Sequence, residues 1–242
     1  MRNNKKLIED AAHILSDPKA LSPFIDHTLL KPDATILDIL KLCEEAKSFS
    51  FKAVCVNPNR VALAKTFLES SKVLLASVVG FPLGAHISAI KAREAKFAIS
   101  SGASEIDMVM NLGLFKDKSY DEVAIDIRSV VNTCANMSAY CKVKVIIETG
   151  LLTQDEIRTA CKICEDSGAH FVKTSTGFLG RGASLEDIQI MRESVSEKME
   201  IKASGGIRDL KFAAELIAAG ASRLGTSSGV QLIQALPGSQ GY

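Results

Sequence analysis

The sequence has no apolar run of the about 18 residues that a membrane-spanning helix requires. The N-terminal segment MRNNKKLIEDAAHILS begins basic but lacks the apolar core of a signal peptide. It has no charge excess either, since 29 Lys and Arg face 28 Asp and Glu, and the basic residues are spread along the chain. We therefore expect a cytoplasmic protein whose main partner is neither a membrane nor a nucleic acid.

Cysteine and histidine are too few and too scattered for a disulfide scaffold or a metal centre. Six Cys are spread over 242 residues. The lone pair in Cys161-Lys-Ile-Cys164 lies within a helix-like stretch and lacks the second pair that a zinc ribbon requires. The four His never occur at the i, i+4 spacing typical of metal ligands. We expect no metal and no cofactor.

Short apolar runs of strand length recur along the chain, and each is followed by a segment with helical periodicity. The eight runs are residues 24–26, 53–56, 73–79, 105–109, 143–147, 171–173, 200–203 and 223–225. Thr35, Thr153 and Ser184 each stand three residues before an acidic residue, which is the capping-box pattern at the start of a helix. The chain therefore reads as a repeated βα unit.

The repeat length points to one architecture. Each unit takes about 28 residues, which is close to the spacing of a (β/α)8 TIM barrel. A doubly wound open sheet is the alternative, but the eight even repeats and the lack of a GxGxxG motif after the first run disfavour it. With no linker or shift of composition, we predict one α/β domain that spans residues 1–242.

Two lysines stand where such a barrel has its active site, at the C-terminal ends of the strands. Lys173 and Lys202 both end apolar runs, and adjacent strands lie about 5 Å apart. Burial and mutual repulsion should keep one amine neutral, which activates a nucleophile that forms Schiff bases. The alternative is a lysine that reaches solvent at the rim. We assign charged residues at strand starts, such as Lys142, to solvent.

Asp107 adds a carboxylate on another strand. Its neighbours Ile106 and Met108 are apolar, so the carboxylate needs polar partners. It would move protons at a carbinolamine, the adduct that precedes the imine. A purely structural ion pair with a lysine is the alternative.

Two glycine-rich segments follow the last two runs, at the usual phosphate site of this fold. They are Ser204-Gly-Gly-Ile-Arg208 and Gly225-Thr-Ser-Ser-Gly229. Small residues let backbone N–H groups approach an anion, and a following helix adds a favourable dipole. Cys55, also near a strand end, has no His placed to activate it, so we interpret it as a buried or substrate-lining thiol.

Six motifs resemble those of the 2-deoxy-D-ribose-5-phosphate aldolases, in the same order, from about residue 22 to the end. They are Phe24-Ile-Asp-His-Thr-Leu29, Ala53-Val-Cys-Val56, Val79-Gly-Phe-Pro-Leu-Gly84, Glu105-Ile-Asp-Met-Val109, Lys173-Thr-Ser-Thr-Gly177 and Lys202-Ala-Ser-Gly-Gly-Ile-Arg208. The resemblance implies a metal-free Schiff-base aldolase on a (β/α)8 barrel. Such an enzyme interconverts 2-deoxyribose 5-phosphate with glyceraldehyde 3-phosphate and acetaldehyde.

The resemblance also implies roles for single residues. Lys173 corresponds to the Schiff-base lysine, and Lys202 and Asp107 correspond to residues that assist proton transfer. The substrate-binding positions that it implies are Asp26, Cys55, Thr176, Gly205, Gly206, Arg208, Gly225, Ser227 and Ser228. Some family members carry Lys where this chain has Phe178, so one phosphate-contacting charge is missing here. The segment before residue 20 resembles a helix that covers the base of the barrel.

Other functions stay open at this point. Another Schiff-base aldolase would share the paired lysines but take a different donor, and a non-catalytic sugar-phosphate-binding protein would not need Lys173. We expect sugar phosphates and aldehydes as small-molecule partners, and the chain is compatible with a homo-oligomer, a dimer or a tetramer. The tail that ends in Tyr242 is either an unstructured end or, as the resemblance implies, a segment that visits the active site.

Overall fold

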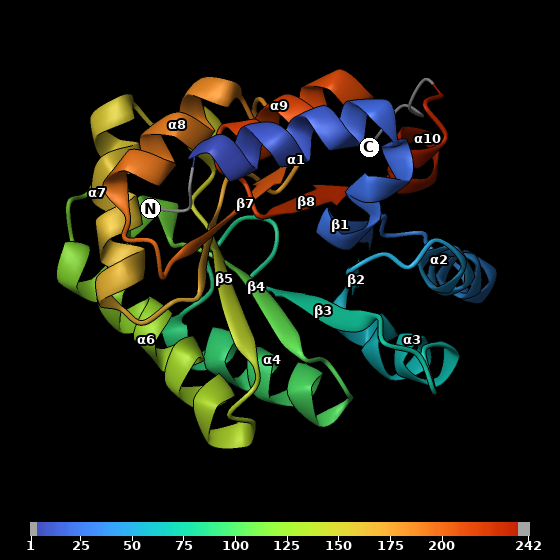
Figure 1. Ribbon diagram of the computed structural model, residues 1–242. Helices are drawn as coiled ribbons and strands as arrows, with labels where there is room; N and C mark the ends of the chain where they lie inside the picture. Colours follow the sequence, from blue (N-terminus) through green and yellow to red (C-terminus); the bar gives the residue numbers. More distant parts are fainter. Residues whose placement is uncertain (1–3, 237–242) are drawn as a thin grey trace.

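The computed structural model describes residues 4–236, and within them eight parallel strands form the predicted closed barrel (Figure 1). The strands pair in chain order, and β8 closes the barrel against β1. Their bounds are β1 Ile25–Leu29, β2 Ala53–Val56, β3 Leu74–Val79, β4 Glu105–Val109, β5 Lys142–Ile146, β6 Phe171–Lys173, β7 Glu200–Ser204 and β8 Arg223–Thr226.

Helices follow the strands and form the outer layer of the barrel (Figure 1). The α-helices are α1 Asn4–Ser16, α2 Ile36–Ser48, α3 Val61–Phe67, α4 Ser88–Ser100, α5 Leu112–Lys116, α6 Tyr120–Met137, α7 Gln154–Asp166, α8 Leu185–Ser194, α9 Leu210–Ala218 and α10 Gly229–Ile233. Three 3-10 turns are η1 Pro18–Phe24, η2 Pro58–Arg60 and η3 Thr149–Leu151.

Two of the three predicted capping boxes are complete, at the starts of α2 and α7. At α8 only half of the box forms. The Ser184 hydroxyl accepts a hydrogen bond from the Asp187 N–H, but Arg181 binds both oxygens of the Asp187 carboxylate. The prediction was wrong in this detail because a guanidinium outcompetes a backbone N–H for a carboxylate.

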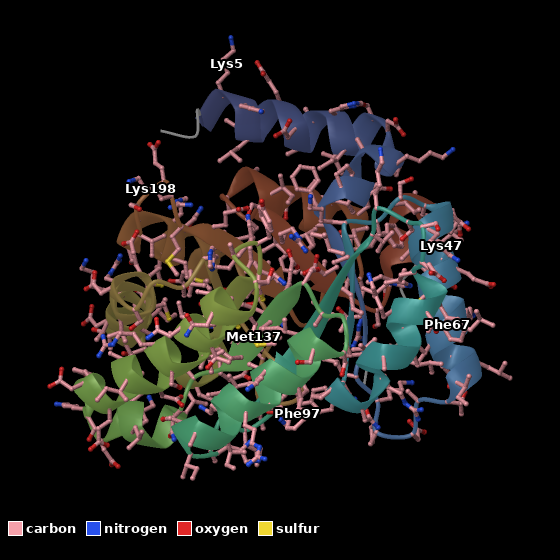
Figure 2. The ribbon with its side chains drawn as sticks, turned by 90° about the horizontal axis from the view of Figure 1, so that it is seen from below. Lys5, Lys47, Phe67, Phe97, Met137 and Lys198 are labelled. Atoms are coloured by element: carbon pink, nitrogen blue, oxygen red, sulfur yellow. The ribbon has the colours of Figure 1, made fainter. Side chains whose placement is uncertain are left out.

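The N-terminal helix α1 packs against α9 and η1 (Figure 1). It buries Leu7, Ala11 and Ile14, while Lys5 projects away from the barrel (Figure 2). The sequence predicts a helix over the base of the barrel, and α1 contacts both α9 and η1, the turn that leads into the N-terminal end of β1. No helix within residues 4–236 is both long and apolar enough to cross a membrane.

The two faces of the strands carry different chemistry because side chains alternate along a strand. On β4, Ile106 and Met108 belong to the apolar core that the strands share with the helices. Glu105 and Asp107 alternate with them and are buried together with charged residues of other strands. The barrel interior is therefore a charged layer, and it positions the candidate site.

Candidate active site

Lys173 and Lys202 lie side by side, as the sequence predicts. They are register partners on β6 and β7. Both ammonium groups donate to the same oxygen of Asp107, with Nζ–Oδ2 distances of 2.8 Å each. Lys173 is 3% exposed and the other two are fully buried. The structure thus brings the three predicted catalytic residues together around one carboxylate oxygen.

A second set of charges lies below this group, and sequence reasoning missed it. Lys144 donates to the other Asp107 oxygen at 2.8 Å and to Glu105 at 2.6 Å. Arg223 pairs with Glu105 at 2.8 Å between Nη2 and Oε2. Its Nε also donates to Asp26 at 2.7 Å, and Asp26 in turn accepts a hydrogen bond from Lys202. The network is a closed ring of alternating charges.

The charges in this ring do not balance. Among the described residues, the connected cluster has four cations, Lys144, Lys173, Lys202 and Arg223, and three carboxylates, Asp26, Glu105 and Asp107. All seven are at most 4% exposed. Because an unbalanced buried charge is costly, the cluster is most stable when one cation gives up its proton.

Lys173 is the group best placed to lose that proton. Burial lowers the pKa of Lys173, the Asp107 carboxylate opposes this, and the charge of Lys202 lowers it further. The net shift is downward. Burial also disfavours the charged form of Lys202, but the Asp107 and Asp26 carboxylates outweigh it and raise the pKa of Lys202 above its ordinary value. The two lysines therefore differ because Lys202 has a second carboxylate.

Asp107 stays ionised at neutral pH. Burial alone would raise its pKa, but the charges of Lys144, Lys173 and Lys202 outweigh burial and hold the pKa well below its ordinary value. A carboxylate with three ammonium partners accepts hydrogen bonds from all of them. Lys144 thus keeps Asp107 negative even when Lys173 is neutral.

A pocket opens above Lys173 at the C-terminal ends of the strands, and most of the predicted substrate-binding residues line it. These are Thr176, Gly205, Gly206, Arg208, Gly225 and Ser227. Gly205 and Gly206 both have positive φ, 87° and 75°. A side chain at Gly205 would meet the backbone of Gly182 at 2.9 Å. The conformation of the loop after β7 therefore requires glycine, and the backbone of this loop forms part of the pocket wall.

Three predicted substrate-binding residues do not line this pocket. Asp26 is fully buried in the charged ring, where Arg223 and Lys202 neutralise it. Cys55 is fully buried beside Leu30 and Val78, and burial raises the pKa of its thiol to about 11. Ser228 is the residue before α10, with its hydroxyl buried. The burial of Cys55 agrees with the buried thiol that the sequence allowed, whereas position at a strand end did not reveal that Asp26 and Ser228 lie beneath the pocket surface.

Glu148, just after β5, is a further buried acid, and sequence reasoning gave it no role. Its φ is 53°, an uncommon value for a residue with a side chain. One carboxylate oxygen accepts hydrogen bonds from the hydroxyl and the N–H of Thr176, at 2.6 and 3.1 Å. Glu148 thus fixes the turn that follows Lys173.

Phe178 and Tyr242 are two further residues for which the sequence resemblance suggested a role. The Phe178 ring, 37% exposed, packs edge-to-face on Phe81 with centroids 5.1 Å apart. Tyr242 and the rest of residues 237–242 lie outside the described residues. Within the described part, no group of three or more His, Cys, Asp or Glu is arranged to hold a metal ion.

A lysine that loses its proton readily, held in a pocket with little water, condenses with aldehydes and ketones to form Schiff bases. At the mouth of a (β/α)8 barrel, this arrangement defines a class of enzymes that use lysine as a covalent catalyst.

Comparison with known proteins narrows this class. The model of the DeoC/LacD family aldolases matches residues 21–235, and the chain belongs to this family. It is 54% identical over 214 residues to a deoxyribose-phosphate aldolase of Natranaerobius thermophilus, a match that covers 88% of this chain and 96% of that protein. It is 50% identical over 222 residues to the enzyme of that name from Carboxydothermus hydrogenoformans, with coverages of 92% and 97%.

A solved structure agrees with the sequence relatives. The deoxyribose phosphate aldolase from Aeropyrum pernix, described as a unique tetrameric structure, superposes with a TM-score of 0.86 at 31% identity. The match covers 95% of this chain and 96% of that one. The barrel and its strand order are therefore those of the family.

Proposed function

We propose that this chain is a Schiff-base aldolase that reversibly cleaves 2-deoxy-D-ribose 5-phosphate to D-glyceraldehyde 3-phosphate and acetaldehyde. The observation that carries the proposal is Lys173, a buried amine with a lowered pKa at the floor of a pocket of glycine and hydroxyl groups. The relatives at 50% identity and above are named deoxyribose-phosphate aldolases.

The proposed chemistry uses the three groups around Asp107. The neutral Lys173 amine adds to C1 of the open-chain sugar, and the carbinolamine loses water to give a protonated imine. The C2–C3 bond then breaks as its electron pair moves into the enamine and a base takes the proton of the C3 hydroxyl, which releases glyceraldehyde 3-phosphate. Protonation of the enamine carbon and hydrolysis of the resulting imine by water release acetaldehyde and restore the Lys173 amine. Asp107, which accepts hydrogen bonds from both lysines, and Lys202 supply and remove these protons. The imine is the electron sink, so the reaction requires no metal or organic cofactor.

The phosphate end of the substrate belongs at the loops after β7 and β8 in this proposal. Gly205, Gly206 and Ser227 would offer backbone N–H groups and a hydroxyl, and Arg208 lines the pocket as an exposed cation. Helix α10 has only five residues, so its dipole contributes less than the sequence led us to expect. Hydrogen bonds would carry most of the phosphate affinity.

Borohydride trapping tests the proposal. Incubation with acetaldehyde and borohydride should add one ethyl group to Lys173, located by peptide mass spectrometry, and EDTA should not prevent it. Label on Lys202 would reverse the two lysines. Without label on any lysine, the chain would be a sugar-phosphate-binding protein. Trapping together with failure to cleave deoxyribose 5-phosphate would indicate an aldolase with another donor.

Three further features belong to the proposal. Residues 1–242 would form one domain, supported by the continuous match of the family model over residues 21–235. The chain would assemble as a dimer or tetramer, supported by the tetrameric structure described for the Aeropyrum pernix aldolase. It would act in the cytoplasm. Light scattering after gel filtration tests the assembly, and a monomer at micromolar concentration would contradict it.

A further inference from the structure

His27 lies between the active site and the outer helices, yet the chemistry above does not use it. It stands on β1 between Asp26, which belongs to the charged ring, and Thr28, which lines the pocket. Because side chains alternate along a strand, His27 points to the opposite face, toward α2 and α10. It is 3% exposed. The imidazole is therefore buried away from solvent, where polar atoms usually need hydrogen-bond partners among neighbouring residues.

One side of the imidazole is fixed by α2. Nε2 lies 2.7 Å from Oε2 of Glu45, and the hydrogen bond from His27 is the main cause that lowers the pKa of Glu45. Since an ionised carboxylate only accepts hydrogen bonds, Nε2 carries the hydrogen. The ring also packs edge-on against Phe51, with centroids 5.2 Å apart. Its orientation is thus determined from two directions.

The other side of the imidazole faces the start of α10. A Cβ built on Gly229 would lie 3.0 Å from Nδ1 of His27 and 3.1 Å from Phe51. The backbone at Gly229 therefore rests directly on the His27 ring. Nδ1 has no hydrogen-bond partner among residues 4–236, and neither does the buried hydroxyl of the adjacent Ser228.

The segment that rests on His27 is the one that carries Gly225 and Ser227, which line the pocket at the proposed phosphate end. On its outer flank, a hollow lined by Ser227, Gln231 and Glu45 borders the segment. The His27 ring supports the segment at Gly229 together with Phe51 and Ile25, and Glu45 holds the ring in place.

We propose that His27, anchored by Glu45, is a positioning residue that sets the phosphate affinity of the enzyme by supporting residues 225–229. This inference rests on the phosphate end of the proposed function. His27 does not touch the Lys173 group, so the carbon–carbon chemistry should not depend on it. Loss of the anchor should weaken binding of a phosphorylated sugar and leave an unphosphorylated one unaffected.

The test compares Glu45→Ala, Glu45→Gln and the control Lys41→Ala on 2-deoxyribose 5-phosphate and on free 2-deoxyribose. Lys41 is an exposed partner of the same Glu45, at 3.8 Å, and does not touch His27. We expect Glu45→Ala to raise KM for the phosphorylated sugar about tenfold with kcat unchanged, the effect of about one hydrogen bond. Its kcat/KM for the free sugar should stay within about twofold. Glu45→Gln retains an acceptor for Nε2 and should resemble wild type, as should Lys41→Ala.

The outcomes separate this inference from the function on which it rests. Equal losses on both sugars, or an unchanged preference for the phosphorylated sugar in Glu45→Ala, would overturn the role of His27 alone. A wild-type enzyme that traps acetaldehyde on Lys173 but treats both sugars equally would overturn the phosphate site, and the role of His27 with it. His27→Phe gives a second measurement, because it keeps a flat ring while removing the bond to Glu45, and it should behave like Glu45→Ala.

Discussion

Lys173 and Lys202 share a single oxygen atom of Asp107, each at 2.8 Å, yet their pKa values move in opposite directions. The difference lies in Asp26, which contacts Lys202 and not Lys173. In the proposed mechanism, this difference leaves Lys202 as a proton donor and Lys173 as the nucleophile. Two residues of the same type, in register on adjacent strands, acquire different chemistry from one additional carboxylate.

Two substitutions of Lys202 distinguish the effect of its positive charge from the effect of its transferable proton. Lys202→Leu removes a cation near Lys173, so the pKa of Lys173 should rise and imine formation should move to higher pH. At pH 7 the trapping rate should fall about tenfold or more, since each unit of pKa removes a factor of ten of neutral amine. Lys202→Arg keeps the charge and should retain much more trapping, measured as a rate against pH. Equal and severe loss in both variants would show that imine formation depends on the transferable proton of Lys202 and not on its charge.

Replacement of Lys173 should cost no stability although it abolishes activity. A lysine whose pKa is lower in the folded state binds fewer protons there than in the unfolded chain. The free energy of unfolding of the wild type therefore increases as the pH rises from the lowered pKa of Lys173 toward 10.5, the pKa of an ordinary lysine. It decreases as the pH falls over the same range. Lys173→Met removes the excess cation, and its free energy of unfolding at pH 7, from urea titration, should equal or exceed that of wild type by about 1 kcal/mol.

Lys144→Met should have the opposite effect on stability. It leaves Glu105 and Asp107 without a shared buried cation, which should lower the free energy of unfolding by about 3–5 kcal/mol. The control is Lys142→Met on the same strand, where a partly exposed pair with Glu200 should contribute less than about 1 kcal/mol. Similar losses in the two variants would contradict the importance of the buried ring.

Two adjacent glycines should respond differently to a methyl group. Gly206→Ala meets no atom within 4 Å and should lose only about 1 kcal/mol of stability from its positive φ. Gly205→Ala also collides with the backbone of Gly182 and must displace the loop. We expect Gly205→Ala to raise KM for deoxyribose 5-phosphate about tenfold or more. A KM equal to that of Gly206→Ala would show that the loop does not require the close approach.

Phe178→Lys should strengthen phosphate recognition. A cation next to Gly177 at the pocket wall should lower KM for deoxyribose 5-phosphate about two- to fivefold, as expected for a partly exposed ion pair. The gain should disappear at about 1 M salt. Phe178→Ala controls for the lost contact with Phe81. If Ala and Lys lowered KM equally, the ring rather than the missing charge would limit binding.

Much of the fold was predictable because the signals were local. Apolar runs, capping patterns at helix starts and a regular repeat specify the βα units, and eight such units close into a barrel. The positions of Lys173, Lys202 and Asp107 near the C-terminal ends of their strands predicted that the three residues lie close together. What the sequence did not indicate was the depth of each residue below the surface, as the burial of Asp26 and Ser228 illustrates.

Lys144, Glu105 and Arg223 were missed for a related reason. Sequence reasoning assigns charged residues near strand starts to solvent, as suits the exposed side of a sheet. In a closed barrel, an inward-facing residue is interior at any height along the strand, so it must find partners on other strands. A charged residue at the inward position of an apolar strand, such as Lys144 between Val143 and Val145, is the signal that could have found them.

The closed ring of charges also constrains how this barrel can change. Asp26, Glu105, Lys144 and Arg223 come from four different strands, and each has partners on more than one other strand. A single change of sign leaves an uncompensated charge in the interior, whereas a matched exchange of an acid and a base preserves the balance. Relatives that differ at one of these positions should therefore differ at its partner as well. Redesign of the floor of the site therefore requires that an acidic residue and its basic partner be replaced together.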